Sequence, residues 1–316
     1  MANHEKKDYQ RKRPPANPQG NLSPHEVEAI QGAIADVEAQ QEAQGYLPNP
    51  PAEPQTCTQS STTLPELSIT CFGRFEIKRS GQPIVLCTNR SAQAILRYLI
   101  AQVGYSASAE KLMAVAWPDN EPEAAQNKLH IAISALRRSL HAGLPSLSGY
   151  GYLVCKSRVY SLNPEAAVRT DVEEFLRCYQ TVLESDAERV AFYERACRLY
   201  TGPFLLEDLY ADWSFLLREQ FKRMYLTMCR VLATHYFQIR YYEEAAMWAT
   251  MILAQDSCDE TAHRQLMQIY AAQGYRSQAI RQYYNCERIL RQELGVQPLL
   301  ATVQLFENLL RDDTSA

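Results

Sequence analysis

The sequence lacks any long hydrophobic run. Apolar residues make up 46% of its 316 positions, but no stretch approaches the roughly 20 consecutive apolar residues that a membrane-spanning helix needs. The first fifteen residues, MANHEKKDYQRKRPP, have no apolar core of the kind that a secretory signal requires. We therefore expect a cytoplasmic protein that has no contact with a membrane.

Glycine and paired cysteine are also scarce. The 12 glycines form neither a GxxxxGK[ST] nucleotide loop nor a GxSxG nucleophile elbow. The nine cysteines are scattered singly without a CxxC pair, and the six histidines form no HExxH motif. Disulfide frameworks and zinc sites need such spacing. The sequence therefore predicts reduced thiols and a protein that is not an enzyme, with no catalytic residue, metal or cofactor.

Charge is unevenly distributed along the chain. The net charge is -4, yet residues 67–164 carry more basic than acidic side chains, whereas residues 1–66 and 165–316 are acidic. Local charge decides which polyanion a surface can hold. The basic middle segment is therefore the candidate for binding one.

The same three segments differ in their predicted structure. Residues 1–66 hold a polar tail, an amphipathic helix expected after Ser23 and a proline-rich linker. Residues 67–164 read as short antiparallel strands, helices within 89–103, 109–117 and 121–141, and a hairpin near 150–162. Residues 165–316 are helical almost throughout, with helices expected near 171–185, 187–201 and 210–228. The sequence predicts a mainly α protein in which an α+β domain precedes an all-α one.

The last segment repeats itself every 34 residues. The matched pairs are Leu232 and Leu266, Tyr236 and Tyr270, Tyr241 and Tyr275, and Ala245 and Ala279. Thirty-four residues is the period of tetratricopeptide-like helical hairpins. We expect their turns at Arg240-Tyr241 and Gly274-Tyr275.

Helical repeats of this kind form grooves that can receive a peptide or a small effector. The aromatic candidates for such a groove are Trp213, Tyr241, Tyr242 and Trp248. Aromatic side chains at this spacing pack inside the core more often than they bind a ligand. Both interpretations remain open at this point.

The predicted helix at 121–141 has one face without acidic side chains. Its apolar stripe comprises Leu129, Ala132, Ile133, Leu136 and Leu140. On a helical wheel, Asn127, Ile131, Ser134 and Arg138 lie opposite that stripe, with His130 and His141 on one side of them and Lys128 on the other. Arg137 lies nearer the boundary of the stripe. Residues 126–143 contain no Asp or Glu, which suits a polyanion better than a solvated surface.

A basic hairpin follows this helix, with Lys156 and Arg158 at its turn. A helix after a tight turn, followed by a hairpin, is the layout in which a recognition helix enters the major groove of DNA. Asn and Arg side chains can read base edges, and Lys can neutralise phosphates. We predict double-stranded DNA contacts by Asn127, Lys128, His130, Ile131, Ser134, Arg137, Arg138, Lys156 and Arg158. His130, Arg137 and His141 are expected to reach phosphates, whereas Arg138 is central on the outward face.

Two of these assignments have simple alternatives. Two adjacent arginines can be solubilising charges on an amphipathic helix. Ile131 is an apolar residue on an otherwise polar face, so it either contacts a thymine methyl group or packs on protein.

Several motifs resemble a known family. Residues 67–164, with LHIAISALRRSL and YSLNP, resemble an OmpR-type winged helix. The segments YTGPFL and QLMQIYAAQGYRSQAIRQYYNCERILRQELGVQP resemble the bacterial transcriptional activator domain of SARP-type activators. The resemblance covers about residues 67–310 and implies a recognition helix near 121–141 and a wing near 150–162. It also implies a regulator that binds repeated promoter sites as a homodimer and recruits RNA polymerase.

The segment outside this resemblance, residues 1–66, shows no likeness to a receiver domain. A second function class stays open beside the first. The helical repeats could serve as a protein-interaction scaffold whose winged helix no longer reads DNA. Such a scaffold has no need of an acid-free helix face next to a basic hairpin, so charge favours DNA binding.

Overall fold

The computed structural model describes residues 64–144, 151–181 and 185–311. The predicted helix after Ser23 and the linker lie outside these ranges. All of the described residues belong to one unit. Within the described ranges no helix combines the length and the hydropathy of a membrane span.

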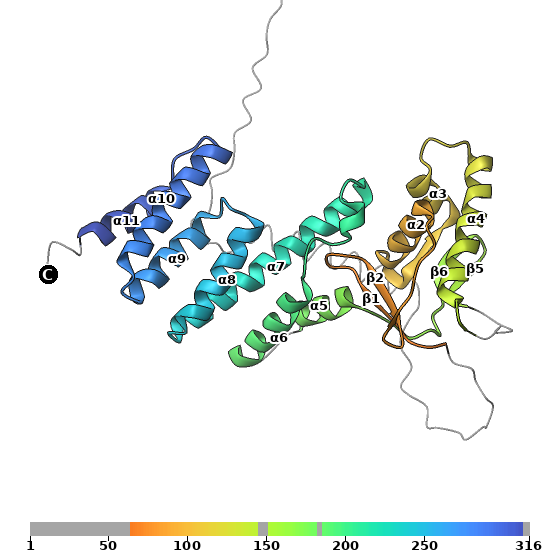
Figure 1. Ribbon diagram of the computed structural model, residues 1–316, viewed down its shortest axis with the longest axis horizontal. Helices are drawn as coiled ribbons and strands as arrows, with labels where there is room; N and C mark the ends of the chain where they lie inside the picture. Colours follow the sequence, from red (N-terminus) through yellow and green to blue (C-terminus); the bar gives the residue numbers. More distant parts are fainter. Residues whose placement is uncertain (1–63, 145–150, 182–184, 312–316) are drawn as a thin grey trace, which may run out of the picture. The chain divides into compact units, whose positions relative to one another are not determined.

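A four-stranded sheet has the order β3-β2-β1-β7; Figure 1 labels its strands β1 and β2. Its strands are β1 (Leu67–Thr70), β2 (Glu76–Arg79), β3 (Gln82–Pro83) and β7 (Val168–Thr170). β1 pairs antiparallel with β2, as the sequence predicts, and Ile69 lies opposite Ile77 with both side chains buried. β7 pairs parallel with β1, so the chain returns to this sheet immediately before the helical region.

Three helices and a second sheet complete the winged helix. The helices are α2 (Arg90–Ile100), α3 (Ala109–Ala116) and α4 (Pro122–His141). The side chains of Asn89 and Ser108 accept backbone N–H groups and cap α2 and α3. The sheet has the order β4-β6-β5, with β4 (Ser106–Ser108), β5 (Leu153–Lys156) and β6 (Val159–Leu162). The short 3-10 helix η1 (Val103–Tyr105) precedes β4.

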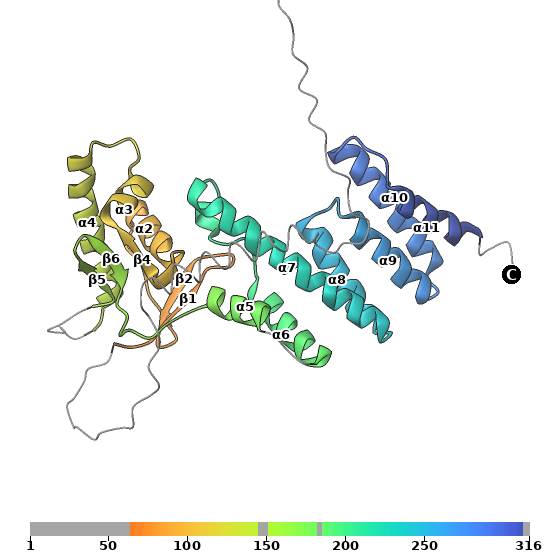
Figure 2. The ribbon, with the colours of Figure 1, turned by 180° about the vertical axis from the view of Figure 1, so that it is seen from behind.

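The remaining elements are helical. They are α5 (Asp171–Gln180), α6 (Asp186–Leu199), the 3-10 helix η2 (Leu206–Asp208), α7 (Asp212–Gln238), α8 (Tyr242–Gln255), α9 (Glu260–Ala272), α10 (Arg276–Glu293) and α11 (Leu300–Arg311). The helix expected at 210–228 does not end there, because α7 continues as one helix of 27 residues. From α7 to α11 each helix packs on the next, which both views show (Figures 1 and 2).

The 34-residue repeat extends to the backbone of the turns. Tyr241 N donates to Tyr236 O and Tyr275 N donates to Tyr270 O, each at 2.8 Å. The residue before each tyrosine has a left-handed conformation, with φ 65° at Arg240 and 82° at Gly274. Ala245 and Ala279 are fully buried at equivalent places, where a small side chain lets helices approach closely. The predicted winged helix followed by tetratricopeptide-like helices is therefore confirmed.

The winged helix and the first helices share one hydrophobic core. The ring of Phe72, just after β1, lies 4.9 Å from that of Phe175 on α5 and 5.4 Å from that of Phe221 on α7. The Asp171 carboxylate at the start of α5 accepts the N–H groups of Cys71 and Phe72 at 2.8 to 2.9 Å. These contacts fix the start of the helical region against the first sheet.

A buried ion pair makes a second connection. Arg97 on α2 binds Asp208 of η2 through two hydrogen bonds, Nε to Oδ2 at 2.6 Å and Nη2 to Oδ1 at 2.9 Å. The two side chains are only 7% and 10% exposed. Tyr98 packs edge-on against Trp213 next to this pair. The position of α2 relative to η2 and α7 is therefore held by both charge and packing.

Candidate nucleic-acid interface

Helix α4 has the amphipathic character that its sequence predicts. Pro122 occupies the first turn, where its missing N–H costs no hydrogen bond. The apolar stripe is buried, with Leu129 and Leu136 almost fully shielded from solvent. The predicted contact residues Asn127, Lys128, His130, Ile131, Ser134, Arg137 and Arg138 are all exposed. The structure therefore brings these seven side chains together on the outward side of one helix.

Arg79 on β2 holds the end of α4 in place. Its Nη1 donates to Leu140 O at 3.0 Å and its Nη2 donates to Ala142 O at 2.6 Å. A cation at a helix C-terminus satisfies free carbonyl groups and complements the helix dipole. Sequence reasoning missed this residue, because the contact joins positions 61 and 63 apart. The only feature of Arg79 that the sequence shows is a positive charge at the end of a predicted strand, which does not indicate a contact with a helix.

The adjacent arginines differ in their surroundings. Arg137 Nε donates to Leu153 O on β5 at 3.0 Å, which ties α4 to the hairpin. Arg138 lies on the outward face and is exposed. Arg137 thus has a positioning contact that the sequence-based expectation of a phosphate contact did not include.

His141 faces the protein, although the sequence suggested a phosphate contact for it. The Tyr152 N–H donates to His141 Nε2 at 3.2 Å. Burial and the nearby charges of Arg79 and Arg137 lower the pKa of His141, so the ring is neutral at pH 7. A side chain at Gly151 would place its Cβ 1.9 Å from His141 Nε2. This close approach explains the glycine just before β5.

The hairpin β5–β6 has the tight basic turn that the sequence predicts. Lys156 pairs with Val159, and the two residues between them, Ser157 and Arg158, have φ values of 49° and 65°. Positive φ at both positions matches the twist of a two-residue hairpin. Lys156 is exposed at the end of β5.

The other basic residue of this turn has an acidic neighbour. Arg158 Nη2 lies 2.9 Å from Glu110 Oε1 on α3. Hydrogen bonds from the first turn of α3, together with Arg158, lower the pKa of Glu110, so its carboxylate is charged at neutral pH. The positive charge of the wing therefore comes mainly from Lys156. Sequence reasoning missed the contact of Glu110 with Arg158. A Glu at the start of a helix is common because it complements the helix dipole, so it does not by itself indicate a partner.

The aromatic residues proposed for a groove in the repeats have structural roles. Trp213 packs on Tyr98, Trp248 is buried, and Tyr242 packs on Phe237. Tyr241 contacts the ring of Tyr236 but is 56% exposed. A pocket between α8, α9 and α10 is lined by other residues. In the described ranges no three His, Cys, Asp or Glu side chains gather as metal ligands.

Three comparisons relate the chain to known proteins. Residues 170–310 match the bacterial transcriptional activator domain. The transcriptional regulatory proteins MoaR1 of Mycobacterium bovis and Mycobacterium tuberculosis are each 25% identical over 262 residues, which are 80% of this chain and 82% of theirs. The structure of Mycobacterium tuberculosis EmbR, solved in complex with a low affinity phosphopeptide, is similar with a TM-score of 0.58 at 17% identity. That similarity covers 78% of this chain and 65% of the EmbR chain.

These findings agree with the arrangement of the elements. The domain match begins at Thr170, the residue that caps α5, and ends within α11. The MoaR1 proteins are transcriptional regulators by name, and their similarity extends over most of both chains. The likeness to EmbR shows a shared fold. Residues 170–310 thus match a bacterial transcriptional activator domain, and the chain as a whole is similar to SARP-type transcriptional activators, in which a winged helix precedes such a domain.

Proposed function

We propose that this chain is a sequence-specific DNA-binding transcription regulator that acts in the cytoplasm. One observation carries the proposal, namely the exposed outer face of α4, which has no carboxylate from residue 126 onward. A helix face of this composition can approach the phosphates of the major groove without repulsion. In this proposal residues 67–164 bind DNA and residues 165–316 form the activator domain.

Each exposed side chain has a role that its chemistry supports. Asn127 and Arg138 are placed to read base edges through paired hydrogen bonds. Lys128, His130 and Ser134 suit phosphate or base contacts, Ile131 suits a thymine methyl group, and Lys156 and Arg158 of the wing suit the neighbouring backbone. Arg137 positions the wing with its Nε and has further N–H groups for a phosphate.

The family suggests the partners. We propose that a homodimer binds repeated promoter sites and activates transcription by recruiting RNA polymerase. A peptide or a small effector in the helical repeats would be the regulatory partner. The named relatives are transcriptional regulators, which supports a regulator without catalytic activity of its own.

The direct experiment selects fragments from genomic DNA with the full-length chain. We expect enrichment of fragments that share a repeated motif, whose spacing reports the geometry of the dimer. Binding should weaken steeply as salt rises, because neutralised phosphates release counterions. Failure to enrich any motif, together with binding that is insensitive to salt, would contradict the proposal.

One observation favours the scaffold as a second candidate. Ile131 is 64% exposed at the centre of the outward face of α4, and an exposed apolar side chain can mark a protein contact. Substituting Ile131 by Asn separates the two functions. If the face reads DNA, the variant changes the base preference of selected fragments, whereas a scaffold would retain its weak, unselective binding to DNA.

A further inference from the structure

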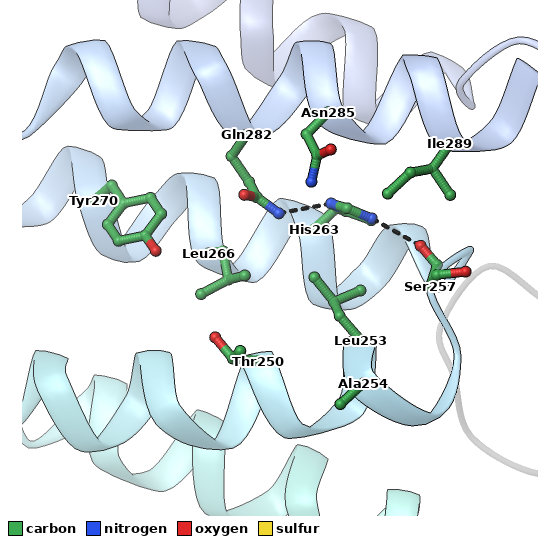
Figure 3. A pocket seen from close by; sticks show the side chains of 10 residues that line it. All are labelled: Thr250, Leu253, Ala254, Ser257, His263, Leu266, Tyr270, Gln282, Asn285 and Ile289. Carbon is green, nitrogen blue, oxygen red and sulfur yellow. Dashed lines mark hydrogen bonds between the residues drawn. The ribbon is translucent and has the colours of Figure 1, made fainter. Parts of the chain in front are cut away.

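The helical repeats contain a pocket of 410 Å³ between α8, α9 and α10. Its lining residues are Thr250, Leu253, Ala254, Ser257, His263, Leu266, Tyr270, Gln282, Asn285 and Ile289 (Figure 3). This volume lies within the range of sites for small molecules, about 300 to 1,000 Å³. The proposed DNA interface is formed by other elements, α4 and the β5–β6 hairpin.

The inner wall of the pocket is fixed by His263. Its side chain is fully buried, with Gln282 Nε2 at 2.7 Å from Nδ1 and Ser257 O at 3.0 Å from Nε2 (Figure 3). The tautomer with a proton on Nε2 satisfies both contacts, because Gln282 then donates and Ser257 O accepts. Burial lowers the pKa of His263, so this wall is uncharged at neutral pH.

Three polar groups on the lining residues are left for a ligand. Among the residues that the structure describes, Tyr270 Oη, Gln282 Oε1 and Asn285 Nδ2 make no hydrogen bond with the protein. Arg288 Nη2 donates to Asn285 Oδ1 at 2.8 Å, which orients the amide so that Nδ2 remains available. The site thus offers a donor, an acceptor and a hydroxyl group. Leu253, Leu266 and Ile289 supply apolar surface around them.

Charge and length limit the class of ligand. No Lys, Arg, Asp or Glu lines the pocket. The charged groups that bind its lining are already hydrogen-bonded, Arg288 to Asn285 and Gln292, and Glu293 to Ser257. A charged ligand would therefore lose hydration without an unpaired counter-charge in the lining. The lining spans at most eight residues along any one helix, as from Gln282 to Ile289, a rise of about 10 Å at 1.5 Å per residue. An extended peptide would place only about three residues in that length.

We infer that this pocket binds a compact, uncharged small molecule that combines an apolar body with hydrogen-bonding groups. The site is separate from the proposed DNA interface, and its existence does not depend on DNA binding.

A matched pair of fluorescent probes tests this inference on the full chain. N-phenyl-1-naphthylamine is neutral, and 8-anilinonaphthalene-1-sulfonate adds a negative charge to the same ring skeleton. We expect the neutral probe to bind in the pocket with enhanced fluorescence. The sulfonate should bind there about tenfold or more weakly, because the lining holds no cation to offset its desolvation. Equal affinity of the two probes for the pocket would contradict the uncharged class of ligand.

Tryptophan substitutions assign the probe signal to the pocket. Ala254 is an exposed wall residue, so Ala254→Trp should occupy the space and weaken binding of the neutral probe by about tenfold or more. Ala191→Trp, at an exposed position on α6, is the matched control and should leave binding unchanged. If Ala254→Trp does not melt cooperatively, Thr250→Trp on the same wall replaces it. The inference is overturned if the neutral probe does not bind, or if it binds the pocket variant as tightly as the unmodified chain.

DNA binding provides a separate readout. Without any probe, Ala254→Trp should bind DNA fragments as the unmodified chain does, because its side chain is outside α4 and the hairpin. If the unmodified chain binds the neutral probe in the pocket but no DNA, the proposed function fails and the ligand site stands. If it binds DNA but the probe signal does not respond to Ala254→Trp, only the ligand site fails.

Discussion

At the scale of single residues, neighbours in the sequence have different roles once they are folded. Arg137 and Arg138 are chemically identical, yet Arg137 Nε is bound to Leu153 O on β5 and Arg138 is on the outward face of α4. His141 accepts a backbone N–H within the protein, whereas His130 is exposed on the outer side of the helix. The contribution of each residue therefore has to be tested singly.

The first prediction separates reading from positioning. Arg138→Ala should weaken binding to a selected site by about 1 to 3 kcal/mol and affect bulk DNA less, because a base contact is lost. Lys156→Ala should weaken both kinds of DNA alike and lower the salt dependence, because only a phosphate contact is lost. Salt titrations of both variants on selected and random duplexes provide the measurement. Equal losses for Arg138→Ala on the two duplexes would mean that this residue does not read the sequence.

The second prediction concerns pH and His263. Its pKa is lowered by burial, so below about pH 6.5 the unfolded chain binds more protons than the folded one. The free energy of unfolding should therefore fall as the pH drops from 6.5 through the folded pKa. Urea denaturation of the unmodified chain and of His263→Gln, across about pH 5 to 7.5, isolates this contribution.

The variant should show the weaker dependence on pH over that interval. His141 also has a lowered pKa and contributes in the same direction in both proteins. The difference between the two curves therefore reports on His263 alone. Parallel curves would show that His263 is protonated equally in the folded and unfolded chains.

At the scale of elements, the two helical hairpins use the same turn with different residues. Arg240 and Gly274 occupy equivalent positions with positive φ. A left-handed conformation costs a residue with a Cβ about 1 to 2 kcal/mol, and glycine avoids that cost. The α7–α8 turn is therefore strained where the α9–α10 turn is relaxed.

The third prediction exchanges the residues at these turns. Arg240→Gly should raise the free energy of unfolding by up to about 1 kcal/mol, and Gly274→Ala should lower it by about 1 kcal/mol. No atom lies within 4 Å of a Cβ built at Gly274, so backbone strain is the only steric term there. Chemical denaturation of both variants checks the opposite signs. Destabilisation by Arg240→Gly would show that the arginine side chain contributes more than the strain costs.

At the scale of the whole molecule, the connection between the winged helix and the helices is the main structural feature. It combines the Phe72 ring cluster, the Asp171 carboxylate and the Arg97–Asp208 pair. Each of these contacts joins residues about 100 or more positions apart. The two regions therefore share one core, although their sequences look like separate domains.

The fourth prediction tests the ion pair. Arg97→Ala should destabilise the protein by about 3 to 5 kcal/mol, because Asp208 would be left buried without its partner. Arg291→Ala, which removes an exposed pair with Glu287 on α10, is the control and should cost under about 1 kcal/mol. Denaturant unfolding measures both. Similar small losses would mean that water replaces the partner of Asp208.

The sequence by itself determined the local features of this protein. The apolar stripe of α4, the cap residues Asn89 and Ser108, the wing turn and the 34-residue repeat depend on residues close together in the chain. Helical periodicity, capping and turn geometry are short-range effects, so a sequence reveals them. For the same reason the outward face of α4 could be proposed before its exposure was known.

Only the tertiary structure decided the contacts between distant positions. It placed β7 beside β1, Arg79 at the end of α4, Glu110 beside Arg158, and the uncharged pocket around His263. Such contacts depend on how whole elements pack, and no periodicity within one segment encodes them. The tertiary structure also decided the length of α7, because packing against α6 and α8 stabilises the helix beyond residue 228.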